Sequence, residues 1–136
     1  MLYKQVNFST FGADCFPGFV GIEVVNVSEN SAVARLEIKK SHFAPNGYIH
    51  AGSIITLADT IAGYACLYNL PESAVSFTTI ELKSNFLGSI KTGYIKAEAT
   101  LQHPGKTTQV WDVIVKSEEY DKTIALFRCT QLILYK

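Results

Sequence analysis

Residues 46–68 read NGYIHAGSIITLADTIAGYACLY, and this stretch decides how the rest of the chain is interpreted. From Ser53 onward, apolar side chains recur with the three-and-four spacing of an α-helix. They form a single stripe that consists of Ile54, Leu57, Ala58, Ile61 and Ala65. Pro71 lies just beyond the end of the pattern, where a helix stop is expected. The stretch therefore predicts one long, buried helix.

Strand-like segments surround this helix on both sides. Before it, a β-branched run at 19–27 predicts a strand, and strict apolar alternation at 31–40 predicts a half-buried one. After it come four more strand-like runs, at 74–87, 93–102, 107–117 and 122–136. Short turns at 103–106 and 117–122 favour antiparallel pairing. Two strands, one helix and four strands predict a two-layer α+β fold.

Composition narrows the function classes. The chain has 136 residues, which suits a single domain over 1–136, and its 12 basic and 12 acidic residues give no net charge. We therefore expect no nucleic-acid partner, and no apolar run of about 20 residues predicts a membrane span. Three scattered cysteines, no leader-like N-terminus and no metal-ligand spacing predict a cytoplasmic protein without a metal.

Asp59 interrupts the apolar helix. The face that it shares also carries the small residues Gly52, Ala62, Gly63 and Cys66, which permit close approach by a ligand or another backbone. Desolvation disfavours a carboxylate, so partial burial would raise its pKa and make it a better base. The alternative is a structural Asp59 paired with a cation or a backbone group, and the helix pattern leaves both interpretations open.

The segment YIHAGS at 48–53 begins the helix. A helix N-terminus presents unsatisfied N–H groups that can stabilise the oxyanion formed when a thioester carbonyl is attacked. Nine residues separate His50 from Asp59, which corresponds to about 13.5 Å of helical rise. If both ends serve one reaction, they must come from two chains, so we expect a homodimer as the minimum active unit.

The segments HAGSIITLADTIAGYA and FTTIELKSNFLGSIKTGYIKAEATLQHPGKTTQVWDVIV resemble hotdog-fold acyl-CoA thioesterases. Within the 4-hydroxybenzoyl-CoA thioesterase superfamily, they are most similar to the PaaI-type, phenylacetate-pathway branch. The resemblance covers about residues 20–135. It implies a long central helix wrapped by a curved antiparallel sheet. It also implies hydrolysis of an acyl- or aryl-CoA without a metal or a separate cofactor, since CoA is part of the substrate.

The resemblance also implies residue roles. Asp59 would be the nucleophile or general base, and the N–H groups of Ala51 and Gly52 would form the oxyanion hole. His50 would orient the turn or the thiol leaving group. Thr79, on the strand after the helix, would hold the attacking water. In the family such sites lie across a dimer interface, and dimers often pair into tetramers.

The sequence departs from the family pattern at Ala44, where an Asn or Gln usually stands six residues before the histidine. Asn46, two residues later, is the candidate substitute. We expect the CoA moiety to contact turn and strand-end residues, of which the candidates are Asn85, Ser89, Gly105 and Lys106.

Four further residues carry expectations of their own. Ser53 is interpreted as the helix cap, and Cys66 as a structural thiol. Arg128 is expected to pair with a carboxylate of a neighbouring subunit in preference to CoA phosphate. Glu81 is the next carboxylate to test, since simple alternation puts it on the strand face of Thr79.

Two other function classes remain open from the sequence. One is a hotdog-fold acyl-thioester hydratase or dehydratase, and the other is a non-catalytic acyl-CoA binding protein. Neither acyl length nor aromaticity of the substrate follows from the residues.

Overall fold

The computed structural model describes residues 2–136. Its helices are α1 (Phe8–Phe11), α2 (Phe16–Val20), the 3-10 turn η1 (Lys40–His42) and α3 (Ala51–Tyr68). Its strands are β1 (Glu23–Ser28), β2 (Ser31–Glu37), β3 (Ala74–Phe86), β4 (Tyr94–Pro104), β5 (Thr108–Ser117) and β6 (Thr123–Tyr135). The chain thus contains two strands, one long helix and four strands, as the sequence predicted.

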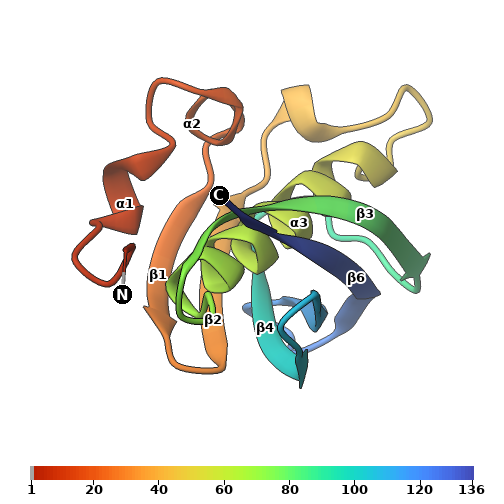
Figure 1. Ribbon diagram of the computed structural model, residues 1–136. Helices are drawn as coiled ribbons and strands as arrows, with labels where there is room; N and C mark the ends of the chain where they lie inside the picture. Colours follow the sequence, from red (N-terminus) through yellow and green to blue (C-terminus); the bar gives the residue numbers. More distant parts are fainter. Residues whose placement is uncertain (1) are drawn as a thin grey trace.

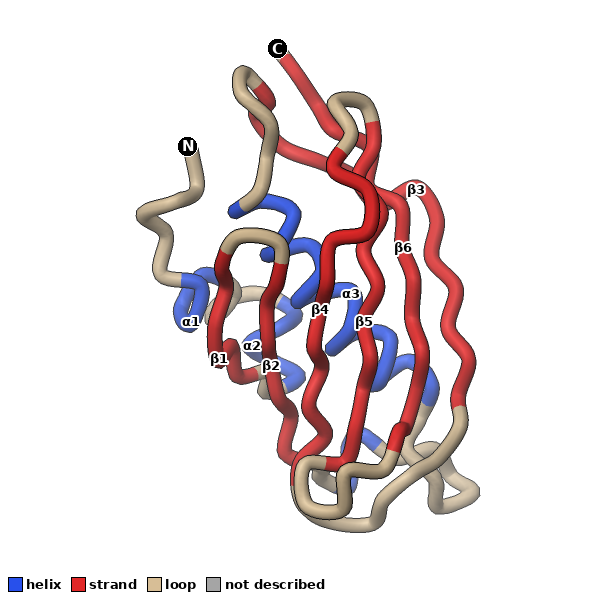
Figure 2. Tube along the Cα trace, turned by 90° about the horizontal axis from the view of Figure 1, so that it is seen from below, coloured by secondary structure: helices blue, strands red, loops and turns tan. Residues whose placement is uncertain are grey.

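The six strands form one antiparallel sheet in the order β1-β2-β4-β5-β6-β3. Figure 1 shows α3 lying along the concave side of this sheet, and Figure 2 shows the strands side by side with α3 behind them. One helix held by a curved antiparallel sheet confirms the predicted α+β class and the hotdog architecture.

The apolar patterns that predicted these elements mark the core. On β2, Ala32, Ala34 and Leu36 are buried, while the residues between them are exposed or half-buried. The predicted helix stripe is buried without exception, with Leu57 and Ile61 fully inaccessible. Although α3 is long and apolar enough to cross a membrane by length and composition, more than half of it is packed inside the protein.

The predicted strand over 19–27 begins too early. Phe16–Val20 forms α2, with Pro17 in its first turn, a position where proline favours a helix. Gly21 ends α2 with φ of +99°, a left-handed conformation that glycine adopts readily. The strand itself starts at Glu23. Apolar composition alone could not separate these short elements.

Gly63 shows why the helix carries small residues on one face. A Cβ atom built on Gly63 would lie 2.9 Å from Cζ of Phe77, a residue of β3. Helix α3 and strand β3 pack this closely because glycine has no side chain at the contact. The small-residue face of α3 therefore allows β3 to approach the helix closely.

Substitution of Gly63 by valine is expected to destabilise the fold by about 1–3 kcal/mol, because the added methyl groups overpack the contact with Phe77. Urea unfolding of the variant measures this. The double variant Gly63→Val, Phe77→Leu should recover part of the loss. An unchanged unfolding midpoint in Gly63→Val would contradict the close contact.

Candidate active site

A buried histidine anchors the chain just before α3. His42 accepts a hydrogen bond at Nδ1 from the Lys39 N–H (2.9 Å), and its Nε2–H donates to the Val20 carbonyl (2.8 Å). Its own carbonyl oxygen accepts from the His50 N–H (2.9 Å) and from the Ser53 hydroxyl (2.9 Å). These bonds fix both sides of the loop that leads into the helix.

His50, and not Ser53, caps α3. The Gly52 N–H donates to His50 Nδ1 at 2.7 Å, which places the ring proton on Nε2. The prediction that Ser53 caps the helix is wrong because its hydroxyl donates to the carbonyl of His42. Within residues 2–136, the Ala51 N–H has no acceptor, so it is the free donor at this helix start.

Asp59 lies half-buried in the middle of α3, on the face that packs toward the edge strand β3. Its Oδ1 lies 3.5 Å from the hydroxyl oxygen of Thr79 on β3, as expected from the strand assignment. Burial raises the pKa of the Asp59 carboxyl, and a hydrogen bond donated by the Thr79 hydroxyl would oppose that rise. A carboxyl whose pKa is raised by burial is a candidate functional group.

Glu81 does not share the strand face of Thr79. The register of β3 against β6 shifts between Thr79 and Glu81, so that Thr79 pairs with Gln131 while Glu81 pairs with Thr130. This β-bulge adds one residue and turns the next side chain to the other face. Glu81 is exposed on the outer face, which contradicts the prediction drawn from simple alternation.

Asn46 is engaged in its own turn. Its Oδ1 accepts from the Tyr48 N–H (3.2 Å), and the Ala44 N–H donates to the Tyr48 carbonyl (2.7 Å). The side chain of Asn46 is exposed. A role at the carbonyl end of the substrate would require it to leave this turn.

An apolar depression of about 470 Å³ opens beside the start of α3. Its lining residues come from the loop, the helix and the segments after β3 and before β6, and they are Tyr48, Ile49, Ala51, Ile54, Phe86, Gly88, Ser89 and Lys122. The Ser89 hydroxyl accepts from the Ile49 N–H (3.1 Å), so it braces this depression. Ala51, whose N–H is free, is one of its lining residues.

The four predicted CoA-contacting residues do not gather in one place within a chain. Ser89 lines the depression at the start of α3, whereas Lys106 lines a separate one with Pro71 beyond the end of α3. Gly105 occupies the turn between β4 and β5. Asn85 faces a third depression, on the outer face of the sheet.

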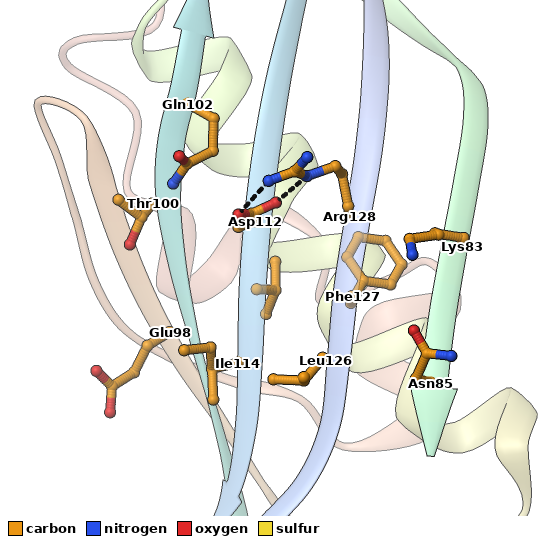
Figure 3. Close-up of a pocket in the computed structure, with 11 residues that line it drawn as sticks. Lys83, Asn85, Glu98, Thr100, Gln102, Asp112, Ile114, Leu126, Phe127 and Arg128 are labelled. Carbon is orange, nitrogen blue, oxygen red and sulfur yellow. Dashed lines mark hydrogen bonds and ion pairs between the residues drawn. The ribbon is translucent and has the colours of Figure 1, made fainter. Parts of the chain in front are cut away.

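That outer depression, of about 460 Å³, is drawn in Figure 3. Asp112 and Arg128 form a two-bond ion pair across its floor, with 2.8 Å between Arg128 Nη2 and Asp112 Oδ2. The predicted pairing of Arg128 with a neighbouring subunit is therefore wrong, because β5 of the same chain supplies the carboxylate. Asp59 does not line this depression, so it is separate from the candidate site.

The remaining side chains of interest are structural or scattered. Cys66 and Cys129 are buried, and burial raises the pKa of each thiol to about 12, so neither is a thiolate nucleophile. Among residues 2–136, no three His, Cys, Asp or Glu side chains are grouped so that they could hold a metal ion.

Sequence reasoning missed Gln131, which is fully buried and accepts a 2.6 Å hydrogen bond from the Thr79 hydroxyl. The sequence of β6 contains a pattern that could have identified Gln131. Phe127, Cys129 and Ile133 alternate as inward-facing positions, and Gln131 continues the same alternation. A glutamine at a core position of a strand indicates a specific hydrogen-bond partner.

A long helix wrapped by an antiparallel sheet defines the hotdog fold, which here carries a half-buried carboxylate at mid-helix and a free N–H at the helix start. The thioesterase superfamily model matches residues 46–124. The chain therefore belongs to the thioesterase superfamily, and the PaaI-type resemblance drawn from its motifs is confirmed.

Individual relatives of the chain are also thioester hydrolases by name. A 1,4-dihydroxy-2-naphthoyl-CoA hydrolase of Listeria monocytogenes is 33% identical, over 82% of this chain and 89% of its own. The acyl-coenzyme A thioesterase PaaI of Escherichia coli is 32% identical, over 80% of this chain and 75% of its own. The crystal structure of a thioesterase from Haemophilus influenzae superposes with a TM-score of 0.88 at 25% identity, covering 99% and 96% of the two chains.

Replacing Asp59 by asparagine should stabilise the protein at neutral pH. Burial raises the carboxyl pKa in the folded state, so the folded protein binds a proton more tightly and loses stability as pH rises above the unfolded pKa. The Asp59→Asn variant has no carboxyl to deprotonate, so it does not lose stability in this way. Its melting temperature should exceed that of the wild type at about pH 7, and the gap should close on acidification to about pH 3. A gap that widens on acidification would show that Asp59 is stabilised as an anion.

Proposed function

We propose that the protein hydrolyses an acyl- or aryl-CoA thioester to the free acid and CoA, with Asp59 as general base. The supporting observation is the desolvated carboxyl of Asp59 beside the Thr79 hydroxyl, 3.5 Å away. Asp59 takes a proton from water as the water oxygen attacks the thioester carbon. The sulfur of CoA leaves when the tetrahedral intermediate collapses.

The Ala51 N–H is proposed as the main oxyanion donor. It is free at the positive end of the α3 dipole, where developing negative charge is stabilised. Gly52 can add a second donor only if His50 releases its N–H, because His50 Nδ1 holds it at 2.7 Å. The release would free His50 to hydrogen bond the departing thiol.

The two groups would meet across a homodimer. Ala51 and Asp59 are eight residues apart on one helix, about 12 Å of rise, which is too far for one carbonyl to contact both. On β3, Leu82 and Phe86 face the helix side yet are 37% and 43% exposed, so this inner surface is uncovered in a single chain. A second subunit packed there would bury both apolar side chains.

The edge of the sheet favours the same arrangement. β3 is a 13-residue edge strand, whereas the opposite edge strand, β1, packs against α1. Long free edges pair readily with another strand. Ile114 and Leu126, exposed on the outer face, suit a further pairing of dimers into a tetramer.

The substrate class follows from chemistry at the start of α3. The depression there is lined mainly by apolar groups of Ile49, Ile54 and Phe86, with Tyr48 at its rim, and would hold an apolar acyl or aryl group. Lys122 lines it as well and would attract the negative charge of CoA. The buried thiols of Cys66 and Cys129 suit a cytoplasmic location, where cysteines stay reduced.

Thiol release from a panel of acyl- and aryl-CoAs tests the proposed activity. Asp59→Asn should lower kcat by about 100-fold or more, because the amide cannot accept the proton of water. The exposed aspartate variant Asp14→Asn is the matched control and should keep full activity. Hydrolysis that survives in folded Asp59→Asn would contradict the role of Asp59, and hydration of an enoyl-CoA without hydrolysis would favour a hydratase.

Mixed dimers test the shared site. Ala51→Pro removes the proposed oxyanion N–H at the first helical position, where proline fits, and His50 already has the extended conformation that a following proline requires. Chains with Ala51→Pro and chains with Asp59→Asn should each be inactive. Their mixed dimers hold one intact site in two.

Since random pairing makes about half of the dimers mixed, co-expression should restore about a quarter of wild-type activity. Each variant expressed alone provides the control. A mixture that stays inactive although mixed dimers are detected by mass spectrometry would place both groups within one chain.

A further inference from the structure

Three polar side chains cross the inner face of the sheet beneath α3. Thr79 of β3 pairs in register with Gln131 of β6, and Gln131 pairs with Gln109 of β5. Both glutamines are buried, with exposed fractions of 0% and 1%. A buried amide without partners costs about 1–3 kcal/mol, so each glutamine is held there by specific hydrogen bonds.

The two glutamines serve different partners. Gln109 donates to the carbonyl of Asn69 (2.8 Å) at the end of α3 and accepts from the indole N–H of Trp111 (2.9 Å). These bonds join the helix end to the sheet. Gln131 instead accepts from the Thr79 hydroxyl at 2.6 Å, and its Nε2 lies 3.5 Å from the sulfur of Cys129. Of the two, Gln131 is the one connected to the candidate site.

Thr79 has one hydroxyl proton and two possible acceptors. Its oxygen lies 2.6 Å from Gln131 Oε1 but 3.5 Å from Asp59 Oδ1. The shorter contact takes the proton, because hydrogen bonds between oxygens are strongest near 2.7 Å. Thr79 therefore turns a lone pair toward Asp59.

We propose that Gln131 is a positioning residue: its amide oxygen keeps the Thr79 proton away from Asp59, so that Thr79 faces the site as an acceptor. This inference rests on the proposed thioesterase function. A water molecule between two acceptors donates one hydrogen to each, which leaves its lone pair free to attack the thioester carbon. That water gives one proton to Asp59, and Thr79 keeps its own.

In the described part of the chain, no cation forms an ion pair with Asp59 that would set its pKa in place of Thr79. From β6, the titratable side chain on the Asp59 side is Cys129, whose thiol has its pKa raised to about 12 by burial and by the charge of Asp59. On α3 itself, the Cys66 thiol is likewise neutral. From β3, the inward-facing side chains carry no charge, and they are Phe77, Thr79, Leu82, Ser84 and Phe86.

Lys4 contacts α3 at its far end, over the ring of Tyr68, whereas the strands and the short helix α2 packed against α3 present uncharged side chains to it. Within residues 2–136, α2 contains no ionisable residue. The inward-facing side chains of the remaining strands are Val24 and Val27 of β1, Ala32, Ala34 and Leu36 of β2, Ile95, Ala97, Ala99 and Leu101 of β4, and Gln109, Trp111, Val113, Val115 and Ser117 of β5. Of the polar side chains on these elements, Thr79 is the one whose hydroxyl lies within reach of the Asp59 carboxyl.

The variant Gln131→Met tests the proposal, since methionine has a similar volume but no amide oxygen. The Thr79 proton should then turn to Asp59 and stabilise its anion, so the pKa of Asp59 should fall. The acidic limb of kcat/KM against pH should move to lower pH. At neutral pH, kcat should fall about tenfold with KM little changed, since the weaker base acts on a less well-oriented water.

Two matched variants separate positioning from packing. Gln109→Met removes an equally buried amide from the same row but one that does not contact Thr79, so the acidic limb should stay in place. In a Thr79→Val background, Gln131→Met should no longer move the limb, because its effect passes through the Thr79 hydroxyl. A limb that stays in place in folded Gln131→Met, that moves equally in Gln109→Met, or that still moves without the hydroxyl would overturn the proposal.

A readout independent of hydrolysis keeps this inference apart from the proposed function. Carbon NMR of the Asp59 carboxyl, assigned by its absence in Asp59→Asn, follows the titration directly. The apparent pKa should be lower in Gln131→Met than in the wild type. If the wild type hydrolyses no CoA thioester, the proposed function fails while this titration still decides the role of Gln131.

Discussion

The central constraint of the structure is that α3 cannot rotate about its axis to expose the Asp59 carboxylate fully to water. Leu57, Ala58 and Ile61, the apolar neighbours of Asp59, are fully buried against the sheet. Rotating α3 to hydrate Asp59 would expose them, at about 1.5–3 kcal/mol for each large side chain. Asp59 is therefore held half-desolvated, and its raised pKa is a consequence of packing. Under the proposed function, this partial exposure lets water reach Asp59, and the exposed apolar side chains Leu82 and Phe86 of β3 leave a surface for a second subunit to cover.

Local sequence patterns predicted most of the fold. The features that they did not predict depend on strand pairing and on helix capping. The stripe through Leu57 and the alternation around Ala34 depend on nearby residues alone, and both were predicted correctly. The orientation of Glu81 could not be predicted, because the bulge in β3 arises from its register with β6. The partner of Gln131 lies 52 positions away in the sequence, beyond any local pattern.

The start of α3 shows a similar division. Sequence motifs located the helix start, but the cap depends on backbone angles. His50 has extended backbone angles and directs its ring nitrogen to the Gly52 N–H. Of the two expected oxyanion donors, the Ala51 N–H is therefore free and the Gly52 N–H is already hydrogen-bonded. Under the proposed mechanism, Ala44 in place of the usual amide side chain leaves fewer groups to polarise the carbonyl, so that more of the catalysis would depend on the base and its water.

The most direct test of a site shared between Asp59 and a partner's helix start is a crystal structure with an uncleavable substrate analogue, in which CH₂ replaces the thioester sulfur. The account predicts a dimer in which the analogue's carbonyl oxygen lies within about 3 Å of the Ala51 nitrogen of one subunit. A water should bridge the carbonyl carbon and Asp59 of the other. A carbonyl bound beyond reach of Asp59, or contacting both groups of a single chain, would contradict it.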